Sequence, residues 1–149
     1  MRIPAVACVL LLLGAVGCGR DRQVPESGEA LCSPSYEPRE LVVLGPCYSP
    51  PPIASGRAPG EARSTDPGAI RKVAAAACSL PAPPPDVACT AEMGPAYQLR
   101  FVDTRGRATT LDAAGFGCRF VDGLGVRRFD ARPLWAALTA AGLPAPGRR

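Results

Sequence analysis

Apolar and polar residues alternate most regularly over positions 96–103, where Tyr97, Leu99 and Phe101 occupy every second place. This period of two predicts a strand with one buried face. A turn that contains glycine follows, and residues 107–113 return as the antiparallel partner. The sequence therefore predicts a hairpin as the best organised part of the chain.

Shorter apolar runs at 40–48, 117–121 and 126–129 predict further strands. The sheet has four or five strands, depending on whether the last of these runs pairs. Residues 49–65 are rich in Pro, Gly, Ser and Ala, which predicts a long exposed loop. Residues 81–86 read PAPPPD and predict a stiff, extended connector.

Two segments carry apolar residues at helical spacing. The first follows Asp66, which is a suitable N-cap, and Pro67, which fits the first helical turn; it reaches Cys78. The second runs over about 133–141, with Gly142 as its C-terminal cap.

This order of elements predicts an α+β fold. It consists of a small antiparallel sheet of four to five strands, covered on one face by two helices and stapled by disulfides. The predicted domain is residues 40–145. The uncovered sheet face would carry Arg100, one of Thr109 and Thr110, and Arg119, open to solvent or to a partner.

The N-terminal segment has the form of an export signal. A short positive start precedes an apolar run from Ile3 to Leu13, which is too short to span a bilayer comfortably as a mature helix. Small residues follow this run. We therefore expect residues 1–17 to be a signal peptide.

The residues Ala15-Val16-Gly17-Cys18 resemble the lipobox of bacterial prolipoproteins. The resemblance implies cleavage before Cys18 and attachment of acyl chains such as palmitate to that cysteine. Residues 18–39 would then tether the domain to membrane lipid on the extracytoplasmic face of the cell membrane. Two alternatives stay open: cleavage to an ordinary secreted protein, and retention of the segment as an anchor.

Missing residue types exclude several functions. The chain contains no His and no Asn, which removes Ser-His-Asp and Cys-His-Asn catalysis and His-ligated zinc. No glycine-rich phosphate loop or Asp-rich calcium loop is present. The net charge of +4 comes almost entirely from arginines that are not interleaved with aromatic residues, which argues against nucleic acid as a partner. We therefore expect a protein without enzymatic activity, cofactor or metal.

The chain has seven cysteines. Removing Cys8 with the signal and Cys18 by acylation leaves five, so outside the cytoplasm we expect two disulfides and one spare thiol. Spacing alone does not choose among the possible arrangements. No Cys-x-x-Cys pair is present to favour metal or redox chemistry.

The predicted elements favour the pairs Cys47–Cys78 and Cys89–Cys118. Cys78 faces inward from its helix, and Cys47 lies at the end of the strand beneath it. Three outcomes stay open for Cys32: a free thiol, a bond to Cys47 in place of Cys78, or a bond to a partner.

Residues 89–118 read CTAEMGPAYQLRFVDTRGRATTLDAAGFGC. Pro95 follows six residues after the first Cys, and the segment continues with an alternating strand, a Gly-basic turn, a second strand, the aromatic Phe116 and a closing Cys. This pattern resembles the reactive-site half of the subtilisin-inhibitor-like proteins of streptomycetes, and residues 40–121 follow that family more loosely.

The resemblance implies a five-stranded antiparallel sheet with two helices and the same two disulfides. It also implies that a segment just after Cys89 presents a scissile bond to a subtilisin-like protease. Carried onto this chain, that segment is Thr90 to Met93, with Ala91 at the primary specificity position and Glu92 following. The alternative interpretation is that these residues are only a loop leading into a strand.

Two hypotheses for function follow. The first is a non-enzymatic cell-surface lipoprotein, a small disulfide-stabilised interaction or envelope module. The second is a membrane-tethered inhibitor of subtilisin-like serine proteases, which would act through Ala91 and Glu92.

The assignment of the anchor leads to a first test. Replacing Cys18 by Ala removes the acylated atom, so a Cys18→Ala variant should be released to the medium, as measured by fractionation of cells and medium. If the variant stays bound to the membrane, residues 15–18 are not the anchor.

Overall fold

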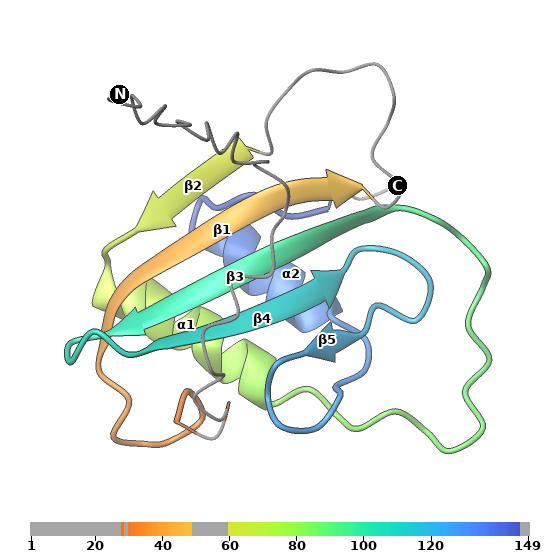
Figure 1. Cartoon of the computed structure of the whole chain (residues 1–149), viewed down its shortest axis with the longest axis horizontal. Helices are drawn as coiled ribbons and strands as arrows, with labels where there is room; N and C mark the ends of the chain where they lie inside the picture. Colours follow the sequence, from red (N-terminus) through yellow and green to blue (C-terminus); the bar gives the residue numbers. More distant parts are fainter. Residues whose placement is uncertain (1–27, 29, 49–59, 147–149) are drawn as a thin grey trace, which may run out of the picture.

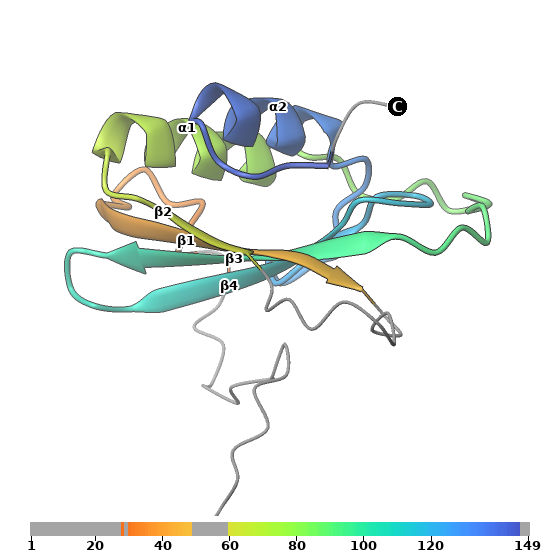
Figure 2. The same cartoon turned by 90° about the horizontal axis from the view of Figure 1, so that it is seen from above.

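The computed structural model describes residue 28, residues 30–48 and residues 60–146. The predicted signal peptide and Cys18 lie outside the described residues. The described chain forms one five-stranded antiparallel sheet with two helices packed on one face (Figures 1 and 2), which confirms the predicted α+β fold. The elements are β1 (Pro38–Tyr48), β2 (Gly60–Ser64), α1 (Pro67–Cys78), β3 (Pro95–Asp103), β4 (Ala108–Ala114), β5 (Val121–Asp122) and α2 (Arg132–Ala140).

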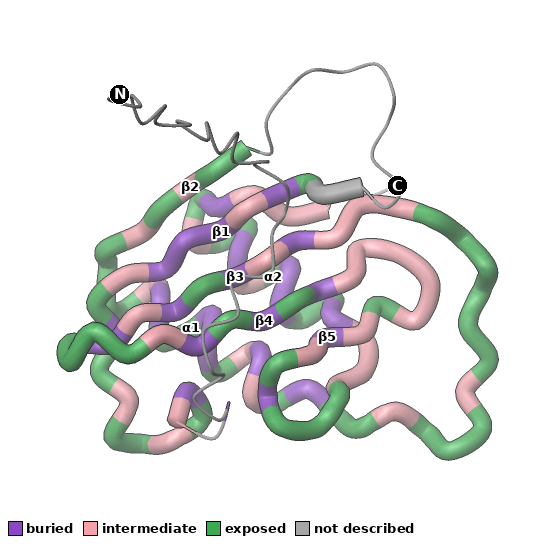
Figure 3. The backbone as a smooth tube through the Cα atoms, in the orientation of Figure 1, coloured by how far each residue is buried: buried purple, intermediate pink, exposed green. Residues whose placement is uncertain are grey.

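The sheet has the strand order β2-β1-β3-β4-β5, so β3 lies at its centre. The register places Leu41 of β1 opposite Phe101 of β3, and Leu99 of β3 opposite Leu111 of β4. These side chains are buried beneath the helices (Figure 2), whereas most of the alternate positions along the strands are only partly buried or exposed (Figure 3). The helices contribute further fully buried residues to the same core: Ile70, Val73, Ala77, Leu134 and Leu138.

Helix α1 begins where its sequence predicts. The Asp66 side chain accepts hydrogen bonds from the backbone N–H of Gly68 at 2.8 Å and of Ala69 at 3.3 Å. These bonds satisfy two donors that have no partner within the helix. Pro67 occupies the first turn, where its missing N–H costs nothing.

Helix α2 ends at the predicted glycine. Gly142 has φ +69°, a left-handed conformation that glycine adopts without a steric penalty. The N–H of Gly142 donates to the Thr139 carbonyl at 3.0 Å, and the N–H of Leu143 donates to the Leu138 carbonyl at 2.9 Å. This pair of bonds closes the helix as a Schellman motif.

Two predicted stretches differ from the structure. Part of the predicted loop 49–65 is strand β2, which pairs with β1 alone and keeps most of its residues exposed, so it carries no alternating apolar pattern. In the predicted strand 117–121 only Val121 joins a strand, because Gly117 (φ +55°) and Arg119 (φ +51°) turn the backbone out of the extended region. The predicted strand 126–129 is reduced to a single bridge between Arg128 and Val121.

The folded unit begins before residue 40, so the predicted tether boundary at residue 39 is wrong. Leu31 is 3% exposed and belongs to the core. Its neighbour Cys32 is bonded to Cys78, with a Cα–Cα distance of 5.5 Å. The segment before β1 is therefore packed against the end of α1.

The predicted Cys47–Cys78 bond is wrong as a consequence, because Cys78 is taken by Cys32. Cys47 pairs through its backbone with Ala96 near the far end of β1, whereas α1 ends beside the segment that precedes β1 (Figure 1). The second predicted bond, Cys89–Cys118, is present, with a Cα–Cα distance of 5.1 Å.

The Cys32–Cys78 bond leads to a stability prediction. It joins residues 46 positions apart, so replacing both cysteines by Ala should lower the free energy of unfolding by about 4 kcal/mol in the chain-entropy model. Denaturant titration measures this loss. A Cys47→Ala variant is the control, and its peptide map without reductant should still contain the Cys32–Cys78 bond. Recovery of a Cys47–Cys78 peptide from the unmodified protein would contradict the structure.

Candidate functional site

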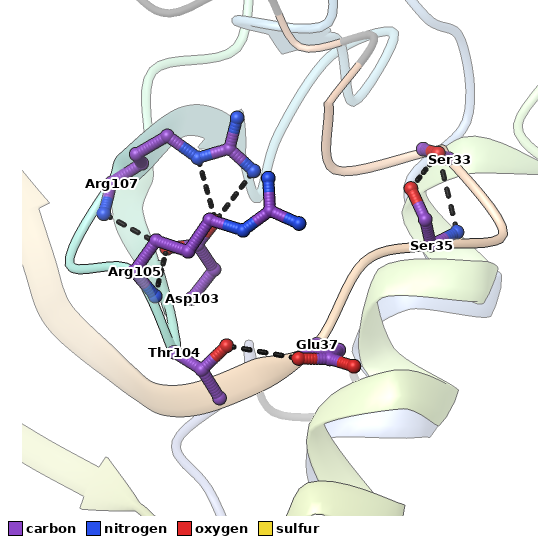
Figure 4. A network of polar contacts seen from close by, with 7 residues as sticks. All are labelled: Ser33, Ser35, Glu37, Asp103, Thr104, Arg105 and Arg107. Carbon is purple, nitrogen blue, oxygen red and sulfur yellow. Dashed lines mark hydrogen bonds and ion pairs between the residues drawn. The ribbon is translucent and has the colours of Figure 1, made fainter.

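The candidate sites outside the core lie at the two ends of β3: a polar cluster at its C-terminal end and an exposed loop before its N-terminal end. At its C-terminal end, Asp103 is 5% exposed and accepts hydrogen bonds from the backbone N–H of Arg105 and of Arg107, both at 2.9 Å (Figure 4). The Arg107 side chain adds a hydrogen bond from Nε at 2.8 Å and an ion pair at 2.7 Å. Thr104 next to it donates to the Glu37 carboxylate at 3.1 Å, which joins this turn to the start of β1.

This polar cluster holds Asp103 in its charged form. Burial opposes the charge, but the backbone and side-chain hydrogen bonds from Arg107 and the backbone hydrogen bond from Arg105 outweigh it and lower the pKa of Asp103. Burial, and then the charge of Asp103, raise the pKa of Tyr36 to about 12. The donors to Asp103 come from its own turn, so we interpret this cluster as a structural one that stabilises the β3–β4 hairpin.

The lowered pKa of Asp103 implies a dependence of stability on pH. Because the folded pKa is below the unfolded one, the stabilisation is complete above about pH 4 and is lost as pH falls through the folded pKa. An Asp103→Asn variant should therefore be less stable at pH 7 and should lose less stability between pH 5 and pH 2. Thermal unfolding across this pH range measures both effects.

Ser79→Ala is the control for that experiment. It removes a side-chain hydrogen bond to the backbone carbonyl of Ala76, in which no titrating group takes part, so it should keep the wild-type dependence on pH. An Asp103→Asn protein with an unchanged acid-range loss would contradict this account.

At the other end of β3, a loop without regular secondary structure joins α1 to the strand and projects from the edge of the molecule (Figure 1). Its proline-rich first part, residues 81–86, is held by a hydrogen bond from the Phe129 N–H to the Pro81 carbonyl at 2.8 Å. The four residues Thr90 to Met93 are all exposed (Figure 3). Met93 is 69% exposed, the largest value among the exposed large apolar residues of the described chain.

The exposed segment is anchored on both sides. The Cys89–Cys118 bond fixes its N-terminal side. On its C-terminal side, the N–H of Gly115 donates to the Pro95 carbonyl at 2.9 Å. Both anchors lie in the turn that joins β4 to β5, so one short element holds the two ends of the loop.

Two shallow hollows flank the disulfide. The first, of about 320 Å³, has a largely apolar lining that includes Phe116 and Phe120, with Asp112, Asp122 and Arg127 also around it. Arg127 forms two hydrogen bonds to Asp122, at 2.8 and 3.1 Å, and its guanidinium lies 4.8 Å from the centre of the Phe120 ring. The surface of this first hollow, beside the loop, is therefore apolar and has charged side chains at its edge.

The second hollow, of about 260 Å³, is more polar and is lined in part by Arg119, Asp130 and Arg132. A side-chain hydrogen bond from Arg132 is the main cause that lowers the pKa of Asp130, and the same contact raises the pKa of Arg132. Arg119 (φ +51°) and Asp130 (φ +58°) both have left-handed backbones, held by backbone hydrogen bonds between their two segments.

The structure describes some of the predicted site residues and leaves others outside the described part of the chain. Ala91 and Glu92 lie together in the exposed loop, where only Thr90 separates them from the bonded Cys89. Cys18 and the side chain of Cys47 lie outside what the structure describes. The polar cluster at Asp103 was not predicted, although an Asp that precedes Gly106 by three residues is a recognisable turn signal.

The described residues contain no group of three or more His, Cys, Asp or Glu side chains placed to hold a metal ion. Neither helix in the described part of the chain is long and apolar enough to cross a membrane. No protein-family model, curated protein or solved structure matches this chain significantly. The site therefore has to be interpreted from its own geometry, which offers an exposed, anchored segment of main chain for recognition.

Proposed function

We propose that this protein is a non-enzymatic module, anchored through acylated Cys18 to the extracytoplasmic face of the cell membrane, that binds a protein partner through Thr90–Met93. The observation that carries the proposal is the exposure of these four residues between two anchors on one turn. Two disulfides in a small domain are typical of proteins outside the reducing cytoplasm, which supports the proposed location.

The physical reason for assigning binding to this loop is the cost of ordering. A flexible segment loses conformational entropy when a partner fixes it, whereas an anchored segment has already lost much of it on folding. The exposed Met93 adds an adaptable apolar side chain of a type that is enriched at interfaces.

Site-specific photo-crosslinking in intact cells tests this proposal. A photoreactive phenylalanine at Glu92 should give a covalent adduct with a second protein. The same probe at Arg100, which is exposed on the uncovered sheet face, should give none. Adducts from position 100 alone would move the binding surface to the sheet, and no adduct from either position would contradict the proposal.

A second candidate makes the partner a subtilisin-like serine protease. The resemblance of residues 89–118 to the reactive-site half of subtilisin inhibitors supports it. The exposure of the Ala91–Glu92 peptide bond, two residues after a disulfide, also favours it. In this case Ala91 enters the primary specificity pocket, and the anchored loop keeps the bond in place.

Titration of subtilisin with the purified domain distinguishes the two candidates. An inhibitor should abolish protease activity at equal concentrations, and Ala91→Asp should weaken inhibition at least about a hundredfold, because a charge is costly to bury in an apolar pocket. Ala82→Asp places the same charge on an exposed residue of the same connection and should have no effect. Unchanged subtilisin activity would exclude this candidate and leave the module with another partner.

A further inference from the structure

The turn between β4 and β5, residues 115–118, contacts both ends of the Thr90–Met93 loop. Cys118 is bonded to Cys89. A side chain on Gly117 would place its Cβ 3.3 Å from the Thr90 carbonyl oxygen, so the turn passes close to the start of the loop. At the other end, Gly115 donates to the Pro95 carbonyl.

The remaining residue of this turn, Phe116, packs on Gly94. A Cβ added to Gly94 would lie 2.9 Å from the Phe116 Cβ and 3.2 Å from the first two ring carbons that follow it. The ring thus lies against the backbone directly after Met93. Gly94 is the residue with the greatest backbone freedom at this end of the loop, and the Cβ and the ring of Phe116 lie against it.

The loop has few internal restraints of its own. Within the described chain, no backbone or side-chain hydrogen bond involves any of the residues 90–93. Its conformation therefore depends on what holds its two ends. The disulfide restrains only the N-terminal end, and β3 begins only at Pro95.

We infer that Phe116 is the positioning residue of this loop: by packing on Gly94 it fixes the C-terminal end and, together with the disulfide, orders Thr90–Met93 before a partner binds. The inference rests on the proposed function for its consequence in binding. The order of the loop itself is measurable without any partner.

Backbone ¹⁵N relaxation measures that order. In the wild type, the order parameters of residues 91–94 should be close to the value of about 0.85 for a rigid backbone. In Phe116→Ala they should fall below about 0.6, while those of β3 and β4 stay unchanged. Phe116→Tyr keeps the ring and should restore the wild-type values.

Phe120→Ala is the matched control. It removes an aromatic ring from a neighbouring position whose contacts are with Phe129 and Arg127, so the loop should stay ordered. Gly94→Ala perturbs the same contact from the loop side, because the added methyl group meets Phe116, and it should also raise loop mobility. This second variant gives the test if Phe116→Ala does not fold.

Binding is then measured with subtilisin as the probe. If the wild type inhibits, Phe116→Ala should inhibit about tenfold less and should be cleaved faster after Ala91, because a loosened loop must be ordered on binding. A mobile wild-type loop, or an ordered loop in both Phe116→Ala and Gly94→Ala, would overturn the inference. Loss of order in these variants without inhibition by the wild type would contradict only the protease candidate.

Discussion

The burial of one face of β3 beneath both helices is the interaction on which the rest of the molecule depends. Leu99 and Phe101 are at most 1% exposed, and β3 is paired along both edges, with β1 and with β4. A slip of one residue would expose this whole apolar face, so the register is strongly fixed. Because the register is fixed, the turn at one end of β3 and the loop at the other have defined positions.

The two disulfides act on different parts of this frame. Cys32–Cys78 fastens the segment before β1 to the end of α1 and brings Leu31 into the core. Cys89–Cys118 lies outside the core, where it ties the exposed loop to the turn after β4. The first bond therefore serves the fold, and the second serves the surface that we propose for binding.

Local patterns predicted much of this fold. The alternation around Leu99, the cap at Asp66 and the glycine at 142 each act within a few residues, so they are visible in the sequence. Strand β2 was not predicted, because an edge strand with exposed side chains has no apolar period. The partner of Cys78 was missed because it depends on where the chain folds back over a separation of 46 residues.

In the candidate site, too, local features were expected from the sequence and long-range contacts were not. A protruding segment after Cys89 was implied only by the resemblance to the inhibitor family, and in the structure Ala91 and Glu92 are exposed there. The packing of Phe116 on Gly94 joins residues from two different loops, and no local sequence pattern predicts such a contact. What the sequence leaves open is therefore how firmly the loop is held.

If the Thr90–Met93 loop is rigid as well as exposed, it should resist cleavage by a glutamate-specific protease. A protease needs its substrate to be locally mobile as well as accessible. We expect the bond after Glu92 in the wild type to be cut at least about tenfold more slowly than in a variant with Ala at both Cys89 and Cys118. Equal cleavage rates at this bond in the two proteins, measured by mass spectrometry, would contradict this expectation.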